Sequence, residues 1–151
     1  MTRSNAPKSS RKGLGALRLL AAAAAVCAAT GVQAQETFKV GIVSFLSGQA
    51  AESFGIPAVN GAKVLVDAFN KGAAPAPYNK VGFGGMKLEF VYVDEAGGAT
   101  KQVQELKTLY DREKVDAVLG YVSSGDCLAV APAAEEMKKF LILYDCGTPR
   151  I

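Results

Sequence analysis

Apolar residues along the chain recur with two different periods, one typical of strands and one typical of helices. Four short runs rich in β-branched and aromatic residues are bounded by polar residues or glycine, as strands are. Between these runs, apolar residues recur every three or four positions, which predicts amphipathic helices. We predict strands at residues 38–44, 86–94, 116–122 and 140–144, and helices around residues 59–69, 103–110 and 131–139.

The first and third predicted helices carry boundary signals. Lys71 and Gly72 favour an end to the first helix, whose apolar stripe consists of Val59, Ala62, Leu65, Val66 and Phe69. In the third helix, Pro132 lacks the N–H that would bond the carbonyl of Leu128. We therefore expect this helix to begin near Ala131 or to bend there. Residues 72–85 are rich in Pro and Gly and predict a surface loop.

The alternation of strands and helices predicts an α/β fold, with a parallel sheet and helices on both of its faces. Right-handed crossovers return each strand to the same direction. In such sheets, ligands bind beyond the carboxyl ends of the strands. The loops that we expect at this edge are residues 44–54, 121–127 and 145–149.

The first 34 residues have the pattern of a secretory signal peptide. A basic region ends at Arg18, an apolar run of 11 residues follows at 19–29, and small residues lead to Ala34. This run is too short to cross about 30 Å of hydrocarbon as a helix. We therefore expect cleavage before Gln35; the alternatives are a lipid anchor on Cys27 and a retained membrane helix.

Charge and cysteine content change once the leader is set aside. The chain has a net charge of +3, but five of its 17 basic residues lie in the leader, and the rest carries 12 basic and 14 acidic residues. The remaining domain is therefore slightly acidic, and we expect no nucleic-acid partner. Cys127 and Cys146 remain, either as a disulfide or as two inert small hydrophobic residues.

The residue types exclude most kinds of catalytic site. Because the chain has no histidine, it has no Ser-His or Cys-His pair and no imidazole metal ligand. The motifs of dinucleotide, P-loop and α/β-hydrolase sites do not occur. Two cysteines with no other soft ligand do not form a zinc site. We therefore expect a protein that is not an enzyme, with no metal site and no cofactor.

Residues 123–126, SSGD, directly follow the third strand and precede a helix. A helix start presents unpaired backbone N–H groups and the positive end of the helix dipole, and serine hydroxyls add donors. This turn suits a carboxylate, although Ser124 or Asp126 can also simply cap the helix. The loop at 145–149 offers the same two interpretations.

Asp94 and Glu95 end the second predicted strand at the same sheet edge and precede two glycines. Acidic residues at this edge could contact a ligand. We interpret them instead as solvated charges, because most carboxylates on a surface loop have that role.

Several segments follow one another in a distinctive order over residues 38–148: FKVGIVSFLSG, VNGA leading to FN, YVDE, VDAVLGYVSS and LILYDCGT. Their order and spacing, with the leader, resemble the leucine/isoleucine/valine-binding branch of the periplasmic binding proteins, the extracytoplasmic receptors of ABC importers. The resemblance implies that residues 35–151 form the N-terminal lobe of a two-lobed type I binding protein. The chain stops after the fourth predicted strand, so we expect this lobe to be truncated.

The resemblance also implies roles for individual residues. Ser124 corresponds to a serine that binds the ligand carboxylate, Cys146 to a residue whose carbonyl faces an ammonium group, and Thr148 to a threonine beside both groups. Phe54 corresponds to an aromatic residue of the pocket wall. With the turn residues, the predicted ligand-binding set is Phe54, Ser123, Ser124, Gly125, Cys146, Gly147 and Thr148.

Two features depart from the pattern of that family. Its disulfide joins positions at which Gly97 and Ser123 stand here, so a bridge between Cys127 and Cys146 would be a different one. The segment YDCGTPRI also differs from the commoner Ser-Pro/Ala-rich turn. The ligand is therefore either an amino acid or another carboxylate, such as an aromatic acid.

The sequence thus predicts an extracytoplasmic solute-binding receptor of an ABC importer, located in the periplasm after signal-peptide cleavage. The expected partners are a branched-chain or other amino acid, or a related small carboxylate, and the membrane permease of the importer. Two alternatives remain. The same fold could be the ligand-sensing lobe of a membrane receptor or regulator, or an α/β enzyme with catalytic residues beyond Ile151.

Overall fold

The computed structural model describes residues 36–151. The predicted signal peptide, residues 1–34, lies outside the described residues. Four parallel strands form one sheet in the order β2-β1-β3-β4. Their bounds are β1 (Thr37–Ser44), β2 (Lys87–Asp94), β3 (Ala117–Gly120) and β4 (Leu141–Leu143). The four predicted strands and the parallel α/β class are confirmed, with the last two strands shorter than predicted.

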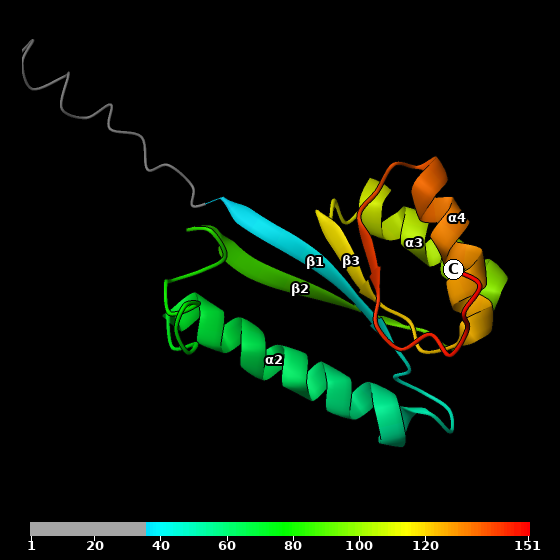
Figure 1. Cartoon of the computed structure of the whole chain (residues 1–151), viewed down its shortest axis with the longest axis horizontal. Helices are drawn as coiled ribbons and strands as arrows, with labels where there is room; N and C mark the ends of the chain where they lie inside the picture. Colours follow the sequence, from blue (N-terminus) through cyan, green and yellow to red (C-terminus); the bar gives the residue numbers. More distant parts are fainter. Residues whose placement is uncertain (1–35) are drawn as a thin grey trace, which may run out of the picture. The chain divides into compact units, whose positions relative to one another are not determined.

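Helices cover both faces of this sheet. The helical segments are the short π-helix η2 (Ala51–Gly55), α2 (Ile56–Lys71), α3 (Ala99–Asp111) and α4 (Ser124–Glu136). Figure 1 shows α2 on one face, and α3 with α4 on the other. This arrangement follows from the strand order, because the α2 crossover moves from β1 to β2 whereas the later crossovers move in the opposite direction.

Alternating residues of the strands supply the two cores. Val43 and Val118 face α3 and α4, where they pack in a buried cluster with Leu106 and Val130. Val40 and Ile42 belong to a smaller cluster with Leu88, on which Val66 and Phe69 of α2 pack. The apolar faces of the strands, with a period of two, therefore pack against the apolar faces of the helices, with a period of 3.6, as the sequence predicts.

The first predicted helix ends as expected, but one residue of its apolar stripe does not join the core. Gly72 caps α2 in the left-handed conformation, with φ of 65°. Leu65 is half exposed, because α2 lies over β1 and β2. An apolar groove of about 290 Å³ therefore remains beside α2, lined among others by Leu65, Phe140 and Ile142.

Of the two alternatives for the third helix, the late start near Ala131 is wrong. Helix α4 begins at Ser124 and continues through Pro132. The hydroxyl of Ser123 accepts a hydrogen bond from the N–H of Asp126 at 3.3 Å and caps the helix. This cap and the burial of Cys127 and Val130 outweigh the single backbone hydrogen bond lost at Pro132.

Within residues 36–151, no helix is long and apolar enough to cross a membrane.

Candidate functional site

The carboxyl ends of the four strands lie at one edge of the sheet. Their last residues are Ser44, Asp94, Gly120 and Leu143. Because the strands are parallel, the loops that follow them emerge on the same side (Figure 1). All of the predicted ligand-binding residues lie in these loops or at the helix ends directly after them.

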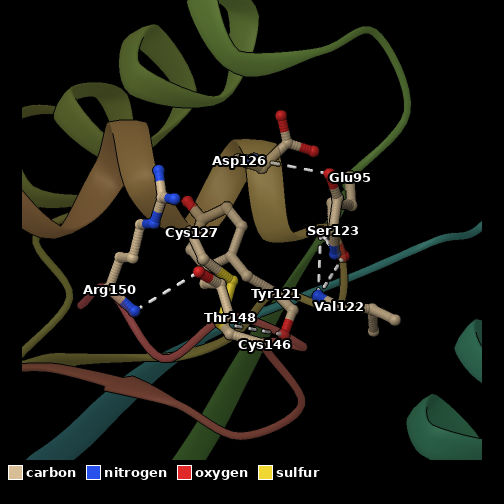
Figure 2. Close-up of a disulfide and its surroundings, with 9 residues drawn as sticks. All are labelled: Glu95, Tyr121, Val122, Ser123, Asp126, Cys127, Cys146, Thr148 and Arg150. Carbon is tan, nitrogen blue, oxygen red and sulfur yellow. Dashed lines mark hydrogen bonds between the residues drawn. A yellow bond between two sulfur atoms is a disulfide. The ribbon is translucent and has the colours of Figure 1, made fainter.

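Glu95 is the most deeply buried acidic side chain at this edge. Its carboxylate accepts the N–H of Val122 at 2.8 and 3.0 Å and the N–H of Ser123 at 2.7 Å (Figure 2). The residue is fully buried. The interpretation of Glu95 as a solvated charge is therefore wrong: it holds the turn between β3 and α4 in place.

Burial governs the ionisation of Glu95. Removal of the carboxylate from water raises its pKa, and the negative charges of Asp126 and Asp94 raise it further. The hydrogen bonds from Ser123 and Val122 favour the ionised form and oppose this shift without cancelling it.

Asp94 is partly exposed, but it also has an organising role. Its carboxylate accepts hydrogen bonds from the N–H of Leu46 at 2.9 Å, the hydroxyl of Ser47 at 2.6 Å and the N–H of Ala96 at 3.0 Å. Desolvation tends to raise the pKa of Asp94, but these hydrogen bonds outweigh it and hold the pKa below its usual value. The two acids thus fix the loops that follow β1 and β3.

The hydrogen bonds to Glu95 change which donors the turn can offer. We expected the backbone N–H groups of the turn to be unpaired, but those of Val122 and Ser123 donate to the Glu95 carboxylate. The N–H groups of Ser124 and Gly125 have no acceptor among residues 36–151, and neither does the Ser124 hydroxyl. The donors that remain therefore lie at the very start of α4, where the helix dipole favours an anion.

The loop after β4 lies directly beside this helix start. A side chain added at Gly147 would place its Cβ 3.4 Å from the Ser124 hydroxyl oxygen. The Thr148 hydroxyl accepts the N–H of Arg150 at 3.3 Å and keeps its own proton for donation (Figure 2). The structure therefore brings together the two loops in which donors were predicted.

Cys127 and Cys146 form a disulfide, which resolves the two alternatives that the sequence left open. Figure 2 shows the bridge between the first turn of α4 and the loop after β4. The backbone carbonyl of Cys146 accepts the N–H of Thr148 at 2.8 Å. One lone pair of that carbonyl is thus already used within the loop.

Phe54 occupies a different part of the edge. It lies in η2, directly before α2, and its side chain is 50% exposed. Gly55 allows this segment to pack against the chain after β1, because a Cβ there would overlap the Phe45 carbonyl. Phe54 is therefore available to contact a ligand, but it does not belong to the Ser124–Gly147 contact.

Sequence reasoning missed Tyr144 and Tyr121. The hydroxyl of Tyr144 donates to that of Ser44 at 3.0 Å, which ties the loop after β4 to β1. Tyr121 adopts a left-handed φ of 70° and is fully buried, so it redirects the chain from β3 into the Ser123 cap. Nothing in the spacing of either tyrosine distinguishes it from an ordinary strand-end residue.

A family comparison accounts for this arrangement. Residues 37–149 match the family model described as periplasmic binding protein. The chain belongs to the periplasmic binding protein family. A comparison with curated proteins finds no match.

Solved periplasmic binding proteins share the fold. A branched-chain amino acid transporter substrate-binding protein from Streptococcus pneumoniae, in complex with isoleucine, has a TM-score of 0.64 and 25% identity over 76% of this chain and 30% of that one. A solute-binding protein from R. palustris in complex with 4-hydroxybenzoate has a TM-score of 0.56 and 29% identity, over 75% and 28%. Another solute-binding protein from R. palustris, in complex with benzoate, has a TM-score of 0.61 and 26% identity over 74% of this chain and 28% of that one. The chain thus spans less than a third of the length of these proteins.

Proposed function

We propose that the chain is the ligand-binding part of an extracytoplasmic solute-binding receptor of an ABC importer, and that it binds the carboxylate of a small solute. One observation carries the proposal: the free donors of Ser124 lie against the loop that contains Gly147 and Thr148. In this proposal, two hydroxyls and two backbone N–H groups bind one anionic group. No covalent chemistry is needed for this role, so the receptor is not an enzyme.

The residues have separate tasks in this proposal. The hydroxyl and N–H of Ser124 and the N–H of Gly125 bind one carboxylate oxygen, and the Thr148 hydroxyl binds the other. Ser123 acts through its cap of α4. The remaining predicted residues contribute shape: Gly147 keeps space beside Ser124, Cys146 fixes the loop, and Phe54 contacts the apolar part of the solute.

Branched-chain and other amino acids, and related carboxylates such as benzoates, are the solutes that we consider. Solved structures of the same fold contain isoleucine or a benzoate. Both kinds of molecule carry a carboxylate, which is the group that these donors suit. The solute would reach the receptor in the periplasm, and a membrane permease of the importer would receive it.

The number of donors limits the affinity of this chain. A hydrogen bond to a charged group contributes about 1.5–3 kcal/mol net. The four donors of this site form at most four such bonds, and after the cost of association these give a dissociation constant of about 1 mM or weaker. We therefore expect weak binding by the 151-residue chain.

Nuclear magnetic resonance titration of the isotopically labelled chain is suited to such weak binding. Sodium benzoate and isoleucine are the two probes, and benzamide, which lacks the carboxylate, is the control for benzoate. We expect the amide resonances of Ser124, Gly125 and Thr148 to shift with at least one carboxylate. Benzamide should leave them in place.

Variants identify the groups that bind. Ser124→Ala and Thr148→Val should each weaken binding about tenfold, which corresponds to the loss of one charge-assisted hydrogen bond. Thr100→Val, on the exposed first turn of α3, is the matched control and should leave the affinity unchanged. Equal affinity in the unmodified chain and both site variants would overturn the proposal.

A further inference from the structure

The Cys127–Cys146 disulfide joins the two loops that carry the proposed donors. Cys127 is the fourth residue of α4, three positions after Ser124, and Cys146 lies two positions before Thr148. We propose that this bridge is the positioning element of the site: it holds the Thr148 hydroxyl where it can share a carboxylate with Ser124. This inference rests on the proposed function.

The helix side of the bridge is rigid. Cys127 is fully buried in the core cluster with Val130 and Tyr121. The N–H of Cys127 also donates to the Ser123 carbonyl at 2.9 Å. The position of the Cys127 sulfur is therefore fixed by the packing of α4 against the sheet.

The loop side has few hydrogen bonds to the rest of the domain, although Arg150 and Ile151 line a pocket with Leu128 and Pro132 of α4. Before the bridge, Tyr144 donates its N–H to the Gly120 carbonyl at 3.3 Å and its hydroxyl to Ser44. The hydrogen bonds that N–H, C=O and hydroxyl groups form in residues 146–151 stay within this segment. The N–H of Thr148 donates to the Cys146 carbonyl, and the N–H of Arg150 donates to the Thr148 hydroxyl. Within the described residues, the disulfide is thus the covalent tether that fixes this segment to α4.

Loss of the tether should affect the two sides of the site differently. Ser124 and Gly125 belong to α4, and the cap by Ser123 and the Glu95 anchor keep them in place without the bridge. Thr148 would be released, because a flexible loop must be ordered again each time a ligand binds. Binding should therefore continue at the helix start but lose the contribution of Thr148.

The test compares the full chain with Cys127→Ala/Cys146→Ala and with Cys146→Ser. The second variant is needed because Cys127 is buried and its replacement can affect folding, whereas Cys146 is partly exposed. Cys27→Ala is the matched control, since Cys27 has no part in the bridge. Thiol titration of the denatured, unreduced chain should find one free thiol, and none in the Cys27→Ala control.

The readout is the titration with sodium benzoate and with isoleucine, followed at single amides. In both bridge-free variants we expect the shifts at Ser124 and Gly125 to persist, the shift at Thr148 to disappear, and the dissociation constant to rise about tenfold. If the bridge merely stabilised the fold, its removal would lower the melting temperature without this difference between the two loops.

The possible failures are distinguishable. If the unmodified chain responds to a carboxylate and the folded bridge-free variants respond identically, including at Thr148, the positioning role is wrong and the proposed function stands. If the unmodified chain shows no carboxylate-dependent shift at these amides, the proposed function is wrong and the positioning role is wrong with it.

Discussion

Individual side chains at the sheet edge are organised around Glu95. Its carboxylate binds the two N–H groups that an external anion could otherwise have used. An internal acid therefore fixes the β3–α4 turn, and the donors of Ser124 and Gly125 stay free one position further along the chain.

Replacement of Glu95 tests this role. Glu95→Ala leaves two partly buried N–H groups unpaired, and each should cost about 1–3 kcal/mol. Glu95→Gln should be milder, because its carbonyl oxygen can still accept from Val122 and Ser123. Urea unfolding measures both, with Glu89→Ala on the exposed side of β2 as the control. Equal stability of the three variants would contradict the anchor role.

Ionisation of Asp94 should make stability depend on pH in the acid range. Because its pKa is lowered in the fold, its contribution is present above the unfolded value of about 3.9 and is lost as the pH falls through the folded value. Asp94→Asn cannot show this loss. The stability difference between the unmodified chain and Asp94→Asn should therefore shrink as the pH falls below about 4. A stability difference that does not change with pH would show that the pKa of Asp94 is not lowered in the fold.

The sequence predicts where some of these side chains lie, but it does not predict the role of Glu95, and the reason is physical. The donors of Ser124 and Thr148 could be located because local order along the chain places them after strands. The role of Glu95 could not, because it depends on N–H groups 27 and 28 residues away. A buried carboxylate and a solvated one have the same local sequence signal.

Strands and helices were more predictable than single side chains. The hydrophobic period located the four strands, and Gly72 located the end of α2. The late start of α4 near Ala131 was wrong because a local rule about Pro132 was given more weight than a cap whose strength depends on the fold around it. The exposure of Leu65 likewise depends on which strands α2 covers.

Close packing between β1 and β3 gives a test at this scale. A Cβ at Gly120 would overlap the Val43 carbonyl oxygen, so Gly120→Ala should force the two strands apart and cost about 1–3 kcal/mol. Gly61 in α2 has open space around it. Gly61→Ala should stabilise the protein by about 1 kcal/mol, because alanine is the better helix former. Thermal or urea unfolding should show a lower free energy of unfolding for Gly120→Ala and a higher one for Gly61→Ala. A change in the same direction for both variants would contradict the packing.

At the scale of the whole molecule, the parallel sheet gathers the candidate site at one edge, and attachments between different loops hold it there. Asp94 joins the loops after β1 and β2, Glu95 joins those after β2 and β3, and the disulfide joins α4 to the loop after β4. Sequence reasoning found the edge from topology alone. It left the disulfide open, because two cysteines 19 positions apart are compatible with several geometries.

The most direct test of the account is a crystal structure of the chain with sodium benzoate or isoleucine at a concentration well above its dissociation constant. The account predicts a carboxylate oxygen within about 3 Å of the Ser124 hydroxyl or N–H, and the other oxygen at the same distance from the Thr148 hydroxyl. A ligand bound in the apolar groove beside α2, or one held at the sheet edge with its carboxylate directed away from both residues, would contradict it.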